Sequence, residues 1–294
     1  MNALASLDRL VVAAVPRDVL VVTGPEAETY LQGQISADVE AMEVGQSTLS
    51  FLLEPRGRVE ALFVISRVGP ETFVADTDAG FGDAMTTSLE RFKLRTKAEF
   101  SLQQWTMHAV RGPTSAAEPT IAAAAAGPAD APEHVMRPTH WPLAGGHDLL
   151  ASPGSTVGSF GQGAEHVSAG EFEALRMAYG LPAMGTEIQP GDIPNETGLV
   201  EQAASFTKGC YRGQELVERI DSRAGGRRGI RRFRAGGSVT AGEELRDADG
   251  AGIGAVLSAA LLDGATVGFA SVRRDAADDA SSDGDQSVVL ADLF

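Results

Sequence analysis

The stretch Lys208-Gly209-Cys210-Tyr211-Arg212-Gly213-Gln214-Glu215 (KGCYRGQE) holds the only cysteine of the chain. Cys210 lies two residues after a lysine and two before an arginine, and nearby positive charge favours the thiolate, which is the nucleophilic and metal-ligating form. The glycines on either side permit tight turns or the close approach of a partner. The alternative is a small cysteine that only packs in the core, because free cysteine is among the most frequently buried residue types. From these residues alone, both interpretations stay open.

The composition limits what the rest of the chain can be. A length of 294 residues predicts two or three domains, and 43% hydrophobic with 22% charged residues is typical of a globular protein. The formal charge of −16 opposes general binding to nucleic acid or to anionic membranes. A single cysteine excludes an intrachain disulfide or a cysteine-cluster metal site, and no apolar run approaches the ~20 residues of a membrane helix. We therefore expect a cytoplasmic protein without a metal centre or a membrane contact.

Strand and helix patterns alternate through the residues that precede the motif. Proline second and glycine fourth in Glu54-Pro55-Arg56-Gly57 suit a type I turn, which makes the flanking strands a β-hairpin. A capping box of Ser168 and Glu171 begins the clearest helix, and Gly180 can follow it as the C′ residue. These patterns predict an α+β arrangement built around hairpins. The expected strands are Val19–Thr23, Ser47–Leu53, Arg58–Arg67, Thr72–Asp76 and Glu99–Val110, and the expected helices are Glu26–Gln32, Phe81–Phe92 and Ala169–Tyr179.

The composition changes after the motif, where short β-type runs recur between glycines and predict a small β-barrel or sandwich. The runs are Ile230–Arg234, Gly252–Ser258, Ala265–Val272 and Ser287–Leu290. Five aspartates between Asp275 and Asp285 indicate a solvated loop before the last strand. Alanine and proline dominate residues 118–133, which we expect to form a loop or linker. The expected regions are therefore an α/β region at 1–117, the linker at 118–133, a second α/β region at 134–224 and the barrel at 225–294.

The stretch KGCYRGQE resembles the signature of the YgfZ family, the folate-binding, iron–sulfur-assembly-associated relatives of the glycine-cleavage T-protein. Other stretches resemble family segments in the same order along the chain. They are YLQGQISADV (30–39), LEPRGRV (53–59), RFKLRTK (91–97), and YGLPAMGT (179–186) followed by IPNE (193–196). The resemblance covers about residues 25–220, and the β-rich tail fits the family's C-terminal barrel.

The resemblance implies a multi-domain cloverleaf of the aminomethyltransferase type around a central opening that holds tetrahydrofolate. It also implies a role in maintaining iron–sulfur enzymes, including one that modifies tRNA, rather than a well-defined turnover reaction. Cys210 and Lys208 are the expected catalytic residues. The expected supporting residues are Gly209, Tyr211, Arg212, Gly213, Gln214 and Glu215, and the expected folate contacts are Arg56, Gly57, Arg58, Glu60 and Gln34.

Two departures separate the chain from the true aminomethyltransferases. The T-protein pattern after the hairpin resembles G-G-I-x-D-D, whereas the matching stretch here ends in Ala61 in place of the second acid. The T-protein's pterin-binding acid, in a stretch like G-Y-T-G-E-D-G-F-E, corresponds here to Ala144 or Gly145. A methyl group cannot transfer a proton or pair with a pterin ring, so we do not expect T-protein chemistry. Glu60 is the nearest substitute acid, but one residue along a strand its side chain points to the opposite face.

Three hypotheses follow. The leading one is a folate-binding accessory factor for iron–sulfur cluster assembly, in which Cys210 relays sulfur, contacts a cluster or senses redox state. In this hypothesis Lys208 and Arg212 favour the thiolate form of Cys210, and Gln214 and Glu215 fix the backbone or orient a partner. The second is a folate-dependent one-carbon transferase. The third is an adaptor for tRNA or protein that uses the stretch Arg219–Arg234, which holds seven arginines against one acid.

Overall fold

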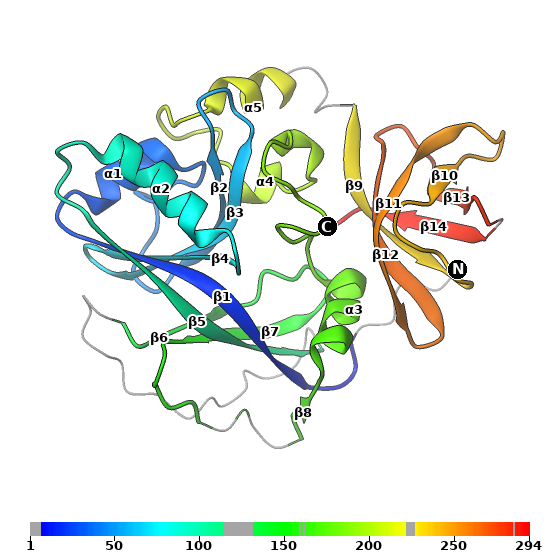
Figure 1. Ribbon diagram of the computed structural model, residues 1–294, viewed down its shortest axis with the longest axis horizontal. Helices are drawn as coiled ribbons and strands as arrows, with labels where there is room; N and C mark the ends of the chain where they lie inside the picture. The colour runs from blue at the N-terminus through cyan, green and yellow to red at the C-terminus, as the bar shows by residue number, and fades with distance from the viewer. Residues whose placement is uncertain (1–6, 114–131, 159, 161–162, 222–226, 285) are drawn as a thin grey trace.

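The computed structural model of the protein describes residues 7–113, 132–158, 160, 163–221, 227–284 and 286–294. Figure 1 shows three lobes around the C-terminus: one with β2–β4, α1 and α2, one with β6–β8 and α3, and the C-terminal barrel. The α+β class and the closed C-terminal barrel expected from the sequence are confirmed. The predicted linker falls outside the described residues up to position 131. No described helix has the length and apolar character needed to cross a membrane.

The first sheet has eight strands in the order β2-β3-β4-β1-β5-β7-β6, with β8 paired to β1. Its strands are β1 (Val11–Thr23), β2 (Ser47–Leu53), β3 (Val59–Gly69), β4 (Thr72–Asp78), β5 (Glu99–Gly112), β6 (His134–Pro138), β7 (Gly145–Ala151) and β8 (Glu165–His166). Strand β1 begins at Val11 rather than at the predicted Val19, because β5 pairs with it along its whole length. The sheet therefore runs through both of the expected α/β regions, with β6–β8 of the second lying beside β5 and β1 of the first.

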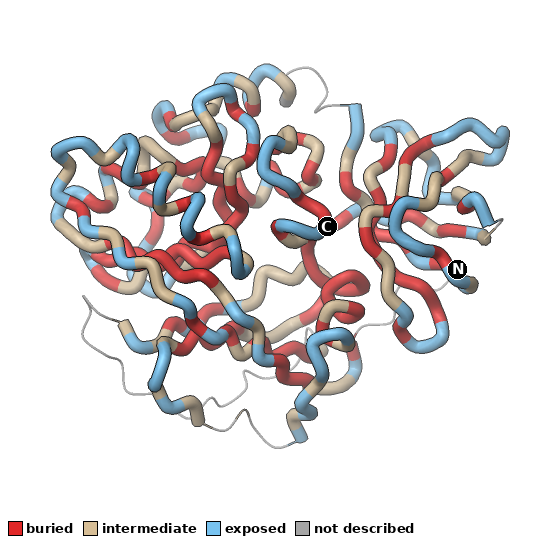
Figure 2. Tube along the Cα trace, in the orientation of Figure 1, coloured by how far each residue is buried: buried red, intermediate tan, exposed pale blue. Residues whose placement is uncertain are grey.

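Helices α1 (Ala27–Gln34) and α2 (Gly82–Lys93) cover one face of the strands β2–β4. On that face Phe63 and Ile65 join the apolar cluster of Met85 and Leu89 from α2. The opposite face packs against the segment that carries α3 (Ala169–Tyr179), η1 (Pro194–Glu196), α4 (Val200–Ala203) and α5 (Gln214–Asp221). Figure 2 shows the resulting buried layer continuing through the sheet into α3 and the barrel.

Helix α3 has the predicted bounds, and the side chain of Ser168 accepts a hydrogen bond from the backbone N–H of Glu171. Gly180 follows the helix in an extended conformation rather than in the left-handed one of a C′ glycine. Glycine is required there for space, because a Cβ atom would lie 2.7 Å from the ring of Trp141.

The closed barrel contains β9 (Arg228–Ala235), β10 (Glu244–Arg246), β11 (Gly252–Leu262), β12 (Ala265–Arg273), β13 (Asp279–Ser282) and β14 (Ser287–Ala291). The expected loop at Asp275–Asp285 is thus partly wrong. Asp279 pairs with Val289, so part of the aspartate-rich segment closes the barrel as β13. The buried Arg232 joins the barrel to the rest of the chain, since its guanidinium donates to the carbonyl of Gly180 at 2.5 Å.

A buried ion-pair network ties the strands of the first sheet together. Asp76 on β4 accepts from Arg17 Nε at 3.0 Å and from Arg137 Nη2 at 3.0 Å. Asp148 on β7 lies 2.6 Å from Arg111 Nη2, and 3.4 Å from Arg137 Nε. Burial alone would raise the pKa values of both carboxyls, but the facing guanidinium groups hold the pKa of each aspartate below its ordinary value.

Candidate functional site

The turn of the β2–β3 hairpin packs directly against the cysteine motif through two glycines. Gly57 and Gly213 both have left-handed backbones, with φ of +86° and +81°. A Cβ on Gly57 would lie 2.6 Å from the carbonyl oxygen of Gly213, and one on Gly213 would lie 2.7 Å from that of Glu54. Only glycine satisfies both the conformation and the space at these positions. The hairpin and the motif are therefore locked together.

Lys208 anchors the motif to the end of α1. Its buried ammonium group donates to the carbonyls of Ile35 at 2.9 Å and of Ala37 at 2.6 Å, and it lies 5.2 Å from the ring centre of Tyr211. Burial lowers the pKa of Lys208 to about 8, against the opposing attraction of nearby carboxylates. The ammonium group of this lysine is therefore engaged by the backbone that follows α1.

Arg212 ties the motif to β3 and α2. Its Nη2 lies 2.9 Å from Glu60 Oε2 and 3.0 Å from Ser88 Oγ, while its guanidinium lies 4.7 Å from the ring centre of Phe92. The backbone N–H of Arg212 also donates to Gly33 O at 3.1 Å. Glu60 is thus ion-paired, and its carboxylate accepts a second hydrogen bond from Ser88.

Cys210 is a free, exposed cysteine between these two anchors. It does not pack in the core, whereas Tyr211 beside it is buried, which raises the pKa of its phenol to about 12. The backbone N–H of Tyr211 donates to Gln214 Oε1 at 3.1 Å, so Gln214 fixes the local turn. Glu215 is exposed in the first turn of α5, where its negative charge interacts favourably with the helix dipole. The contacts of the neighbouring residues therefore hold this backbone in place, while Cys210 itself stays exposed.

The residues expected to contact folate lie at this same junction. Arg56 and Arg58 are exposed, and Arg58 Nη1 donates to Gly191 O at 2.7 Å. Gly57 is buried against the motif. Gln34, the last residue of α1, has a buried Oε1 atom with no hydrogen-bond partner among the described residues.

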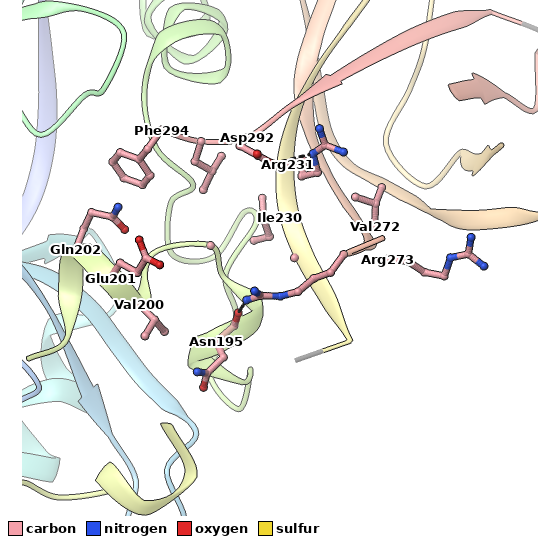
Figure 3. Close-up of a pocket in the computed structure, with 14 residues that line it drawn as sticks. Asn195, Val200, Glu201, Gln202, Ile230, Arg231, Val272, Arg273, Asp292 and Phe294 are labelled. Atoms are coloured by element: carbon pink, nitrogen blue, oxygen red, sulfur yellow. Dashed lines mark hydrogen bonds and ion pairs between the residues drawn. The ribbon is translucent and has the colours of Figure 1, made fainter. Parts of the chain in front are cut away.

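A separate cavity of about 440 Å³ lies between α4 and the barrel, and none of the expected folate contacts lines it. Figure 3 shows Glu201, Gln202 and Phe294 on one side of this cavity and Ile230 with the barrel arginines on the other. Arg274 reaches across from the barrel, and its Nη2 donates to the carbonyl of Asn195 in η1 at 2.8 Å. Sequence reasoning missed Glu201, Gln202 and Arg274, because they come from separate segments and form no motif. Within the described part of the chain, no group of three or more histidine, cysteine or acidic side chains is placed to hold a metal ion.

Comparisons with known proteins agree with this architecture. Residues 18–130 match the family described as the GCVT N-terminal domain. An uncharacterized protein of Haemophilus influenzae is 28% identical over 83% of this chain and 81% of its own length. The tRNA-modifying protein YgfZ of Photorhabdus laumondii is 26% identical over 71% of this chain and 65% of its own. The mitochondrial iron-sulfur cluster assembly factor IBA57 homolog of Mycosarcoma maydis is 28% identical over 70% of this chain.

This chain spans 53% of the length of that IBA57 homolog and just under two thirds of that YgfZ protein. Among solved structures, the glycine cleavage system aminomethyltransferase T of Bartonella henselae superposes with a TM-score of 0.78 at 16% identity, covering 97% of this chain and 86% of the other. That likeness establishes the fold. Residues 18–130 thus match the GCVT N-terminal domain, the chain has the fold of aminomethyltransferase T, and its sequence is distantly similar to the YgfZ and IBA57 proteins.

Proposed function

We propose that the protein is a tetrahydrofolate-binding accessory factor for iron–sulfur cluster assembly or repair and, through it, for tRNA modification, with Cys210 as its functional thiol. The observation that carries the proposal is the exposure of Cys210 in a motif whose other anchors, Lys208, Tyr211 and Arg212, are engaged inside the protein. The names of the distant homologues point to the same two processes.

An exposed thiol on a fixed backbone suits reaction with a macromolecule. The sulfur can approach a cluster or a sulfur donor that is bound to another protein, which a nucleophile at the bottom of a cavity cannot do. A thiolate there provides either a metal ligand or a nucleophile for thiol–disulfide exchange. Lys208 and Arg212 would act by holding the turn that presents the sulfur, since their recorded contacts are with carbonyl, carboxylate and hydroxyl oxygens and with ring faces.

The 440 Å³ cavity has a size and a set of donors and acceptors that fit a folate. The carboxylate of Glu201 suits the amine donors of a pterin ring, and the guanidinium of Arg274 suits the carboxylates of the glutamate tail. Gln202 adds a buried Oε1 atom that has no partner among the described residues. A bound tetrahydrofolate would supply a carrier for one-carbon groups. In this proposal Glu201, Gln202 and Arg274 bind it and fix its orientation.

The transferase alternative lacks a free acid at the expected places. Ala61 and Ala144 are 0% and 3% exposed within apolar clusters. Glu60, the other candidate, forms an ion pair with Arg212 and is therefore not a free acid. A silent Glu60→Ala variant, with no folate-dependent turnover of aminomethyl or N-methyl donors, would end this alternative.

The adaptor alternative rests on Arg219–Arg234, of which residues 222–226 lie outside the described part of the chain, and the described arginines of this stretch do not form one uniform basic face. Arg231 forms ion pairs with Asp278 and Asp292, and Arg232 is buried. Exposed arginines of β9, such as Arg228 and Arg234, remain for a tRNA contact. Such a contact predicts binding that weakens steeply with salt.

The thiol is tested by complementation in cells that lack the native protein. The readout is the activity of an iron–sulfur enzyme that depends on the native protein. We expect cells with Cys210→Ala to show no more of this activity than cells with the empty vector. Thr207→Ala changes another exposed residue of the same loop and is the matched control. If Cys210→Ala supports full activity at equal expression, the proposed thiol role is wrong.

The folate site is tested by anaerobic calorimetric titration with tetrahydrofolate. We expect saturable binding that Glu201→Gln weakens at least tenfold and that Arg58→Ala leaves unchanged. The reverse pattern would place the ligand at the hairpin, and no binding by the wild-type protein would remove folate from the proposal.

A further inference from the structure

A four-residue turn follows helix α2, and its first central residue is Leu94. The backbone N–H of Thr96 donates to the carbonyl of Lys93 at 2.9 Å, which closes the turn. Leu94 has φ of 48° and ψ of −111°, the conformation of the first central residue of a type II′ turn, which glycine favours. A branched apolar side chain is strained there.

The strain brings no compensating burial. Leu94 is 90% exposed, and it is the most exposed large apolar side chain among the described residues. Phe92 beside it is also partly exposed. A strained backbone that displays an apolar side chain to solvent does not stabilise the isolated protein, which points to a contact with another molecule.

Cations surround this side chain in a protein whose net charge is −16. The side chains of Arg91, Arg95 and Lys97 are exposed, and no acidic residue lies between positions 91 and 97. The nearest acids in sequence are Glu90 and Glu99, the latter 3.9 Å from the amine of Lys93, and the carboxylate of Glu26 accepts a hydrogen bond from the backbone N–H of Lys97 at 2.7 Å. We call Arg91, Phe92, Leu94, Arg95 and Lys97 the helix-exit surface.

The helix-exit surface lies beside the cysteine motif. The guanidinium of Arg212 lies over the ring of Phe92, and its Nη1 donates to the carbonyl of Ser88 on α2 at 3.3 Å. Cys210 is two residues from Arg212, so the exposed thiol and the end of α2 lie in one region of the molecule. Figure 1 shows the chain before α5 passing near the same end of the lobe that holds α1 and α2.

We propose that the helix-exit surface docks a protein partner whose surface has an apolar pocket surrounded by acidic side chains, and that docking brings this partner to Cys210. This inference rests on the proposed thiol function. The charge of the surface is complementary to an acidic rim, and Leu94 is shaped to fill an apolar pocket at its centre. A single-stranded nucleic acid would gain from free aromatic faces on which its bases stack, but Leu94 is aliphatic and Arg212 covers one face of Phe92.

The test compares variants of Leu94 with a matched control in the same complementation assay. Leu94→Gly removes the side chain and suits the turn, so we expect it to melt at or above the wild-type temperature and yet to lower the iron–sulfur enzyme activity at least threefold. Leu94→Asp is expected to lower it further. Leu261→Asp, at a residue that is 74% exposed on the barrel, is expected to leave it unchanged.

The outcomes separate this inference from the proposed function. If both Leu94 variants keep full activity while Cys210→Ala loses it, the surface is not a docking site and the thiol role stands. If Cys210→Ala also keeps full activity, both proposals fail. Binding of bulk tRNA by the purified protein that Leu94→Gly weakens would identify a nucleic-acid surface instead. A concentration-dependent dimer that Leu94→Asp dissociates would identify a second copy of the chain as the occupant.

Discussion

Replacement of Gly57 by alanine tests whether the hairpin and the cysteine motif are locked together. The added Cβ would lie 2.6 Å from the carbonyl oxygen of Gly213 and would meet the side chain of Leu216. Gly45 provides the matched control, because it also has a left-handed φ, +95°, but has nothing within 4 Å of its Cβ position.

The two variants differ in one energetic contribution. Gly45→Ala has only the left-handed backbone cost of about 1–2 kcal/mol. Gly57→Ala has the same cost and, in addition, the overpacking of a filled space, about 1–3 kcal/mol. Since about 1.4 kcal/mol corresponds to a factor of ten, the junction should open roughly 5–150 times more often in Gly57→Ala than in Gly45→Ala.

Native-state proteolysis measures this opening locally. Trypsin cannot cleave after Arg212 while its side chain is held by Glu60 and Ser88, so the cleavage rate, followed by mass spectrometry, reports the open fraction. We expect cleavage after Arg212 to be at least fivefold faster in Gly57→Ala than in Gly45→Ala. Equal rates in the two variants would refute the argument that the two glycines are packed against one another.

Two further predictions concern buried charges. Asp76→Asn leaves Arg17 and Arg137 without their shared carboxylate and should destabilise the protein by about 3–5 kcal/mol in urea denaturation. Because Asp76 has a pKa below its unfolded value of about 3.9, its contribution is complete above that pH and is lost as the pH falls through the folded pKa. The difference in melting temperature between wild type and Asp76→Asn should therefore narrow as the pH falls below about 3.9. The folded pKa of Lys208 is about 8, below the ordinary 10.5, so the unfolded chain binds more protons between these values and stability rises with pH there. Lys208→Met should lack this rise, and a stability difference between the two proteins that stays constant from pH 8 to 10 would contradict the burial argument.

Local signals predicted some elements closely and missed others for physical reasons. Strand β2 and helix α3 have the predicted bounds, because a proline–glycine turn and a serine cap mark their ends. The first half of β1 was missed because it contains Pro16, Arg17 and Asp18. The charge of Arg17 is tolerated there through its pairing with Asp76 and Asp78, which lie 59 and 61 positions away.

Two strands of the barrel also could not be predicted from local sequence signals. Strands β10 and β13 have three and four residues, and neither has an apolar alternation. They exist because a closed barrel pairs both of their edges.

For the candidate site, the structure shows contacts that the sequence motif did not predict. The motif indicated that Cys210 matters, and its charged neighbours were expected to act on the sulfur. In the structure Lys208 instead donates a hydrogen bond to the carbonyl of Ile35, a residue 173 positions earlier. No local pattern encodes such a contact. The cavity residues Glu201 and Arg274 carried no signal for the same reason.

The reach of Lys208 back to the end of α1 has a consequence for biogenesis. During synthesis the N-terminal lobe emerges long before residue 208, so the carbonyls of Ile35 and Ala37 stay without this donor until most of the chain has been made. The loop that carries Cys210 becomes fixed only when that late contact forms. A chain that ends before residue 208 therefore leaves both carbonyls without this donor, and the order of the cysteine loop depends on an N-terminal lobe that was made much earlier.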